Sequence, residues 1–155
     1  MVIGKVLLIS FSINIIWSNS ILRWKDFRFP RWIIFSFDRS AVFRFSVGSD
    51  FSQSAKGKLA FHFTNTDGTH DTYAVNQSLD LRDNQWHNVA VTFKANQAGG
   101  LKYYIDGTLI YTDTGSYKPI SNHNDSETPR YGYVGNGVEA NSYKGSTGPD
   151  DLFYG

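Results

Sequence analysis

The stretch WHNVAVTFKANQAGGLKYYIDGTLIY, residues 86–111, carries the strongest structural signal in the sequence. In its first part, His87, Val89, Val91 and Phe93 occupy every second position. A period of two places alternate side chains on opposite faces of a β-strand. The pattern therefore predicts a core strand whose buried face begins at His87.

The dipeptide Asp106-Gly107 lies between two further alternating runs of the same stretch. Because Gly adopts positive φ freely and Asp tolerates it, the dipeptide predicts a two-residue type I′ turn between two strands. A turn of fixed length also fixes which residues face each other. The four expected cross-strand pairs are, from the turn outward, Ile105 with Thr108, Tyr104 with Leu109, Tyr103 with Ile110 and Lys102 with Tyr111.

Short runs rich in Ile, Val and Phe recur through the rest of the chain, with turn residues between them. They lie at residues 32–37, 41–47, 58–64, 69–75 and 131–134. No window of helical length has the apolar period of a helix. Many short strands separated by turns predict an all-β sandwich or barrel with antiparallel strands.

Residues 1–20 fit two interpretations. Residues 2–17 are mostly apolar and are followed by the small polar residues 18–20, as in a secretory signal with its cleavage site. Residues 9–15, however, alternate strictly between apolar and polar side chains, which is the pattern of a half-buried strand. Since polar residues at every second position weaken the apolar segment of a signal, we favour a first strand.

Length, charge and cysteine content exclude several classes of protein. The 155 residues suit one domain with a single core. The formal net charge is +1 with no block of basic residues, so a nucleic-acid or anionic-membrane partner is not expected. Without cysteine, a disulfide framework, a thiolate nucleophile and a zinc site with Cys ligands are excluded. The apolar N-terminal segment is shorter than the roughly 20 residues of a membrane span.

Residues 85–93 and 101–109 together resemble the linked motifs W-H-x-V-A-V-T-[FY] and L-x-x-Y-[IV]-D-G of laminin G-like domains, which belong to the concanavalin A-like lectin/glucanase superfamily. Residues 9–17, 32–45 and 131–135 resemble further strands of the same family. The resemblance implies an all-β fold, an antiparallel two-sheet jelly-roll sandwich.

The two ends of the chain depart from the family pattern. Nothing before Ile9 resembles the family's first strand with its Phe-Asp-Gly, and the chain reaches Gly155 where the Asp-rich closing strand would begin. The resemblance therefore implies one laminin G-like domain over residues 1–155 that lacks a terminal strand at one or both ends. Because an open sheet edge favours association, we expect neighbouring segments of a larger protein to complete it.

Cleavage of a glycosidic bond needs two carboxylates on either side of it. The glucanases of the superfamily supply them from an E-x-D-x-E strand, but the two glutamates of this sequence, Glu127 and Glu139, lie outside any alternating run. Motifs of zinc proteases, serine hydrolases and P-loop nucleotidases are also missing. We therefore expect a domain without enzymatic activity.

Calcium (Ca2+) is the cofactor to consider, because laminin G-like domains often bind it and it takes oxygen ligands from loops. The longest polar segment, residues 116–130, contains the candidate metal ligands Asp125 and Glu127. Asp150-Asp151 is a second acidic pair. Neither pair has the spacing of a known calcium loop, and ordinary solvated acids are the alternative.

Sugar binding requires an aromatic face against the apolar side of the ring, together with planar polar groups. For aromatic residues the alternative is ordinary packing, and for His87 we favour a packed, hydrogen-bonded side chain. His62, between two phenylalanines, is expected on the less buried face of its strand. The candidate ligand-binding residues, all in loops or at loop edges, are Trp24, Tyr117, Tyr131 and Tyr143.

With the resemblance, these observations predict a non-catalytic carbohydrate-binding or adhesion module of an extracellular or secreted protein. Its partner would be a glycan or an extracellular protein. Two alternatives stay open. One is an accessory or degenerate domain of a secreted polysaccharide-degrading enzyme, and the other is a domain that binds protein through an exposed apolar patch.

Overall fold

The computed structural model describes residues 6–14, 32–37, 43–48, 57–67, 70–74, 80–120 and 132–135. Within these ranges the chain forms nine β-strands and no helix. The strands are β1 (Val6–Asn14), β2 (Trp32–Phe37), β3 (Phe43–Val47), β4 (Leu59–Thr64), β5 (His70–Ala74), β6 (Trp86–Lys94), β7 (Lys102–Ile105), β8 (Thr108–Thr112) and β9 (Gly132–Val134). The prediction of an all-β chain is confirmed.

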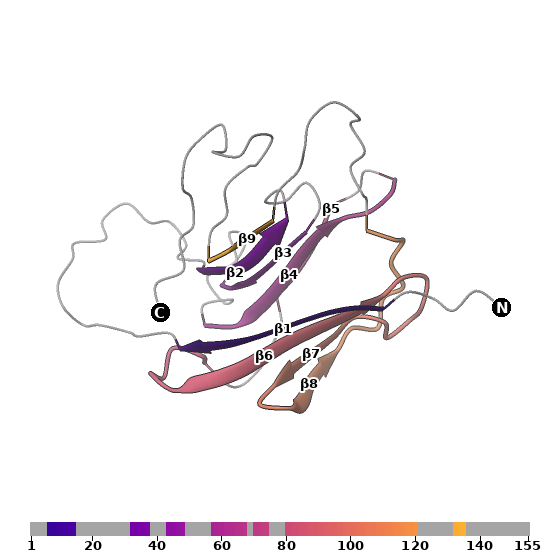
Figure 1. Ribbon diagram of the computed structural model, residues 1–155. Helices are drawn as coiled ribbons and strands as arrows, with labels where there is room; N and C mark the ends of the chain where they lie inside the picture. The colour runs from indigo at the N-terminus through magenta and orange to yellow at the C-terminus, as the bar shows by residue number, and fades with distance from the viewer. Residues whose placement is uncertain are drawn as a thin grey trace.

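The strands form two antiparallel sheets that lie one above the other (Figure 1). The four-stranded sheet has the order β1-β6-β7-β8, and the five-stranded sheet has the order β5-β4-β3-β2-β9. β1 and β2 follow each other in the sequence but lie in different sheets. The predicted two-sheet sandwich is therefore confirmed.

β6 is an interior strand of the four-stranded sheet. β1 pairs with it over nine residues without interruption, and β7 pairs with its other edge. The side chains of His87, Val89, Val91 and Phe93 are buried. The predicted core face of this strand is therefore confirmed.

The hairpin of β7 and β8 contains a β-bulge that the alternating pattern did not predict. The observed pairs are, from the turn outward, Ile105 with Thr108, Tyr104 with Leu109, Tyr103 with Tyr111 and Lys102 with Thr112. The first two predicted pairs are confirmed and the last two are wrong, because Ile110 is an extra residue in β8. The bulge turns Tyr111 to the inner side, where its ring centroid lies 6.1 Å from that of Tyr103.

The turn between β7 and β8 has the predicted backbone geometry. Asp106 and Gly107 both have positive φ, 50° and 76°, as a type I′ turn requires. No heavy atom lies within 4 Å of the position that a Cβ on Gly107 would take. The backbone conformation, and not crowding, therefore favours glycine here.

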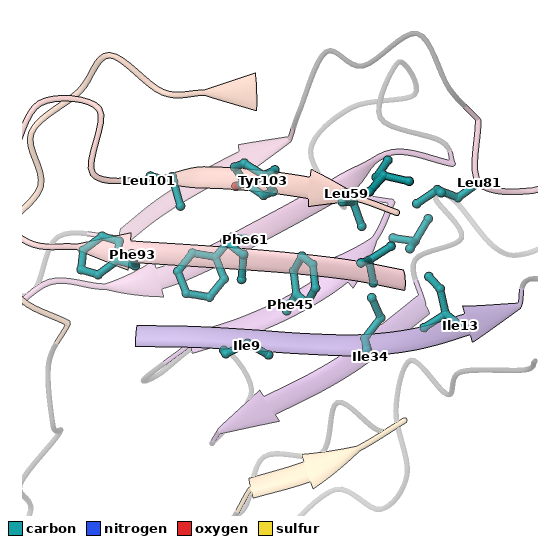
Figure 2. Packing of buried hydrophobic residues seen from close by; sticks show 14 of the residues in the cluster. Ile9, Ile13, Ile34, Phe45, Leu59, Phe61, Leu81, Phe93, Leu101 and Tyr103 are labelled. Atoms are coloured by element: carbon teal, nitrogen blue, oxygen red, sulfur yellow. The ribbon is translucent and has the colours of Figure 1, made fainter. Parts of the chain in front are cut away.

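Side chains from both sheets fill the space between the layers (Figure 2). Phe61 and Phe63 of β4 meet Phe93 of β6 across this space, with ring centroids 6.3 Å and 5.0 Å from that of Phe93. The rings are tilted against each other, an arrangement that aromatic pairs prefer to face-to-face stacking. The other buried members of this core are Ile9, Ile13, Ile34, Phe45, Val47, Leu59, Leu81, Val89, Val91, Leu101, Tyr103 and Ile105.

Candidate ligand-binding face

The four-stranded sheet has a second face, which points away from the core and which we call the outer face. Its residues alternate along each strand with those that enter the core. Trp86, the first residue of β6, is 70% exposed on this face. The other described side chains of the outer face are Leu8, Ser10, Ser12, Asn88, Ala90, Thr92, Lys94, Lys102, Tyr104, Leu109 and Thr112.

Polar side chains lie beside Trp86 on the outer face. Asn88 follows two residues later on β6, and Ser12 of β1 lies opposite Asn88. The amide nitrogen of Asn88 donates a hydrogen bond to the hydroxyl oxygen of Ser10 at 3.4 Å. Alternate residues of a strand are roughly 7 Å apart, so the indole and the amide belong to one continuous surface.

An exposed indole beside an amide and two hydroxyl groups matches the chemistry of sugar recognition. The flat apolar indole can stack on the C–H face of a sugar ring, while Asn88, Ser10 and Ser12 can exchange hydrogen bonds with its hydroxyls. Trp86 was not among the predicted binding residues, which were sought in loops. The alternation of β6 carries the signal, because it places Trp86 on the face opposite His87.

His87 is buried on the inner side of β6, and both of its ring nitrogens contact carboxylates. Nδ1 lies 2.8 Å from Oδ2 of Asp106 in the β7–β8 turn, and Nε2 lies 3.1 Å from Oδ2 of Asp83 in the segment before β6. The backbone N–H of Asn88 donates to the other oxygen of Asp106, and that of Gln85 donates to Asp83. We call Asp83, His87 and Asp106 the His87 cluster. It agrees with the prediction of a packed, hydrogen-bonded histidine.

The carboxylates change the proton affinity of the His87 ring. Burial disfavours the charged imidazole, but the hydrogen bonds to Asp106 and Asp83 outweigh burial, so the pKa of His87 lies above its usual 6.5. The hydrogen bond from His87, followed by that from the Asn88 amide, lowers the pKa of Asp106. The hydrogen bond from the Gln85 amide, followed by that from His87, lowers the pKa of Asp83.

Asp83 and Asp106 are not placed to cleave a glycosidic bond. Both carboxylates turn toward the same imidazole, which occupies the space between them where a glycosidase would hold its substrate. Their role is to hold the ring, and through it the start of β6 and the β7–β8 turn.

Two other contacts hold the beginning of the segment that leads into β6. Leu81 is fully buried, and its backbone N–H donates to the carbonyl of Gly57 at 2.9 Å. Arg82 forms an ion pair with Asp80, and the side-chain hydrogen bond of this pair holds the pKa of Asp80 below its usual range. The segment is therefore fixed at Leu81 by packing and at Asp83 by the imidazole.

Tyr117 is a predicted ligand-binding residue that falls within the described ranges. Its ring meets that of Phe63 edge-on, with centroids 5.6 Å apart, and its hydroxyl donates to Oδ1 of Asp113 at 2.5 Å. Ring and hydroxyl are both engaged inside the domain, which favours the packing alternative. A part for Tyr117 in ligand binding stays a prediction.

The other predicted site residues lie outside the described ranges. They are Trp24, Tyr131 and Tyr143 for the ligand, and Asp125 and Glu127 for calcium, and their roles stay predictions. In the part of the chain that the structure describes, no group of three or more His, Asp or Glu side chains is arranged to hold a metal ion. Nor does this part contain a helix long and apolar enough to pass through a lipid bilayer.

On the far side of the five-stranded sheet, the described side chains of β2, β3 and β4 are buried rather than exposed. Ser36, Arg44 and His62 lie in register there across β2, β3 and β4, and all three are buried. The prediction that His62 lies on the less buried face of its strand is confirmed, since Ala60, His62 and Thr64 are 3%, 6% and 8% exposed while Leu59, Phe61 and Phe63 are 0% exposed, but even this face is buried. Its neighbours Ala60 and Thr64 are buried too, so β4 is enclosed on both faces.

Comparison with known families agrees with this architecture. The laminin G-type family described as the concanavalin A-like lectin/glucanases superfamily matches residues 30–148, more than half of the chain. The chain belongs to this family. No curated protein matches it at a significant level. The laminin G-like motifs at residues 85–93 and 101–109 fall in β6 and in the β7–β8 hairpin, which are the strands that carry the outer face.

Proposed function

We propose that this laminin G-like domain is a non-catalytic carbohydrate-binding or adhesion module of an extracellular protein, and that its ligand binds the outer face at Trp86. The exposure of the indole carries the proposal. Every other aromatic side chain whose exposure is described is buried or half-buried, whereas Trp86 is 70% exposed. Membership of a superfamily that includes lectins supports the proposal.

Stacking of a sugar ring on Trp86 gains free energy from covered apolar surface and loses it where sugar hydroxyls lack hydrogen-bond partners. Covering apolar surface contributes roughly 25 cal/mol per Å², and a sugar ring stacked on the indole would cover one of its two faces. Its hydroxyls must keep hydrogen-bond partners, since an unsatisfied polar group costs about 1–3 kcal/mol. Asn88 and Ser12 provide such partners at the next position along the face, and Ser10, which is hydrogen-bonded to Asn88, lies one position farther from the indole.

The direct test is a glycan array, probed with the domain in the presence and in the absence of calcium. Trp86→Ala should weaken binding at least about tenfold, which corresponds to ~1.4 kcal/mol. Trp86→Tyr should keep part of the affinity, because it retains an aromatic face. Leu109→Ala is the matched control, since Leu109 is an exposed residue of the same sheet face on the outermost strand, β8.

Two results would contradict the proposal. Absence of binding to any glycan, with and without calcium, would exclude the sugar ligand. Binding that is unchanged in Trp86→Ala but lost on substitution of Trp24, Tyr131 or Tyr143 would move the site to the loops. Because Trp86 is exposed, Trp86→Ala should change the free energy of unfolding by no more than about 0.5 kcal/mol, so loss of binding cannot be ascribed to loss of the fold.

A protein ligand is the second candidate, favoured by two other exposed side chains of the outer face. Leu8 is 64% exposed and Leu109 is 48% exposed. The solvent-facing positions of an antiparallel sheet are usually filled by polar residues. Leu8 and Leu109 lie on the edge strands β1 and β8, at opposite sides of the sheet, so each is a separate apolar contact that a protein partner could cover. In this case Leu109→Asp would abolish binding to extracellular matrix proteins in a plasmon resonance assay, and the glycan array would show no binding.

An accessory domain of a polysaccharide-degrading enzyme would instead bind insoluble polysaccharide through Trp86.

A further inference from the structure

We propose that His87 is a proton-controlled clamp that regulates the outer face: the protonated ring holds Asp83, and loss of the proton releases Asp83 together with the residues that lead into Trp86. The effect on ligand binding rests on the function proposed above. The clamp itself rests on the geometry of the His87 cluster.

The two contacts of the ring require two donors. Nδ1 and Nε2 of His87 lie 2.8 Å and 3.1 Å from carboxylate oxygens. An ionised carboxylate accepts hydrogen bonds but has no hydrogen to donate. A neutral imidazole has one N–H and one lone pair, so it can satisfy one carboxylate and must repel the other. The observed arrangement is therefore that of the imidazolium, and the raised pKa of His87 agrees with it.

Geometry also decides which carboxylate is released. Asp106 is 2.8 Å from Nδ1, accepts a second hydrogen bond from the Asn88 amide at 2.8 Å, and lies in a turn that fixes its backbone. Asp83 is farther from the ring, at 3.1 Å and 3.2 Å, and its other partner is the amide of Gln85, two residues away in the same segment. The neutral ring will keep its proton on Nδ1, where it donates a hydrogen bond to Asp106. The Nε2 lone pair then faces Asp83.

No other described charge is placed to take over from the ring. β1 presents the apolar Ile13 opposite His87. Arg82 is adjacent to Asp83 in the sequence, but its guanidinium is bound by Asp80. The charged groups that face the imidazole from the elements packed around it are thus Asp83 and Asp106.

Release of Asp83 acts on the residues next to Trp86. Leu81 remains anchored in the core, so the motion is confined to the few residues between it and β6. The amide of Gln85, the residue before Trp86, is bonded to Asp83 and moves with it. The backbone of residues 82–85, which leads into the indole, is therefore ordered below the pKa of His87 and loosened above it, while the backbone of Trp86 stays paired with Asn14 of β1.

Two substitutions of Asp83 separate the clamp from a purely structural role. Asp83→Asn lets a neutral ring keep both contacts, because the amide can donate to Nε2. Asp83→Ala removes the contact at every pH. Asp67→Asn is the control, since Asp67 is a surface carboxylate paired with Lys118 and not with His87.

The binding probes are cellohexaose, mannohexaose and chitohexaose, measured by calorimetry at about pH 5.5 and about pH 9, on either side of the ordinary pKa of histidine. For a hexasaccharide that binds, the unmodified chain and Asp67→Asn should lose about five- to tenfold in affinity at the higher pH. Asp83→Asn should bind equally at both pH values with the higher affinity, and Asp83→Ala equally with the lower. An equal loss in Asp83→Asn would overturn the regulation.

The clamp is also measured without any ligand, by proton–nitrogen NMR of the His87 ring and of the Gln85 amide. The expected result is two ring N–H groups at the lower pH and one, on Nδ1, at the higher, together with faster hydrogen exchange of the Gln85 amide. A ring with one N–H at the lower pH, or a Gln85 amide that does not respond, would overturn the clamp. Failure of every hexasaccharide to bind, with the NMR result as expected, would count against the proposed function and not against the clamp.

Discussion

The hydroxyl of Tyr117 donates a hydrogen bond to Oδ1 of the buried Asp113 at 2.5 Å. The same carboxylate accepts a hydrogen bond from the backbone N–H of Gly115 at 2.7 Å and a longer one from the hydroxyl of Tyr111 at 3.4 Å. Since the N–H of Asp113 donates to Leu101, this cluster fixes the exit of the chain from β8.

Tyr117→Phe is expected to destabilise the domain by about 1–3 kcal/mol, because a buried carboxylate loses its shortest hydrogen bond. Tyr111→Phe is the matched control, and its cost should be smaller because its hydrogen bond is 0.9 Å longer, 3.4 Å against 2.5 Å. Urea unfolding of both variants measures the difference. Equal costs would show that the length of these hydrogen bonds does not determine their contribution.

Stability should depend on pH through the His87 cluster. The raised pKa of His87 stabilises the fold fully below about pH 6.5, and this contribution is lost as pH rises through the raised value. The lowered pKa values of Asp83 and Asp106 stabilise the fold above about pH 3.8, and that contribution is lost as pH falls through them. The free energy of unfolding should therefore be largest between these limits.

The variant that isolates this effect is His87→Gln. Its unfolding free energy, measured by urea titration across the same pH range, should no longer fall on the alkaline side. If the alkaline slope is the same in His87→Gln as in the unmodified chain, another group is responsible.

Gly100 and Gly107 should respond very differently to alanine. A Cβ on Gly100 would lie 2.1 Å from the carbonyl oxygen of Lys94 and 2.9 Å from that of Gln97, so Gly100→Ala must displace backbone. Its expected cost is more than about 3 kcal/mol, which is above the usual range for a single substitution. Gly107→Ala meets no atom and should cost only the left-handed conformation, about 1–2 kcal/mol. Thermal unfolding monitored by circular dichroism gives the order, and a larger loss for Gly107→Ala would refute it.

Phe61 joins the two layers and should be costly to remove. It is fully buried and has ring contacts with Phe43, Phe63 and Phe93. Phe61→Ala is expected to cost about 3–5 kcal/mol, the sum of lost burial and the remaining cavity. Phe61→Leu keeps most of the volume and should cost clearly less in the same unfolding assay. A loss below about 1 kcal/mol for the alanine variant would mean that the layers repack freely.

The strands could be predicted because their signal is local. Alternation over five to nine residues placed β6 and its core face, and Asp106-Gly107 placed the turn, without knowledge of the rest of the fold. The register beyond the turn could not be predicted, since Ile110 and Tyr111 are both large and apolar and either could face the core. With the bulge, Ile110 and Tyr111 both pack partly against the core, and the hydroxyl of Tyr111 reaches Asp113.

The candidate site was harder to predict because exposure and proximity are tertiary properties. The amino-acid pattern shows that Trp86 and His87 lie on opposite faces, but only the packed structure shows that the indole stays exposed. Asp83 is four residues from His87 and could have been proposed as its partner. Asp106 is 19 residues away and reaches the ring only because β7 folds back on β6.

The pairing of β1 with β6 has a consequence for the order in which the chain folds. Val6 pairs with Lys94, so β1 cannot complete its sheet until the chain has been synthesised beyond residue 94. Contacts between such distant segments form slowly, because a long loop must close before they contribute stability. During that interval the stretch VLLISFSIN, which has no charged residue, is without its partner strand. Newly made chains should therefore be most prone to aggregate before β6 emerges, and chaperone binding to β1 should improve the yield of folded domain.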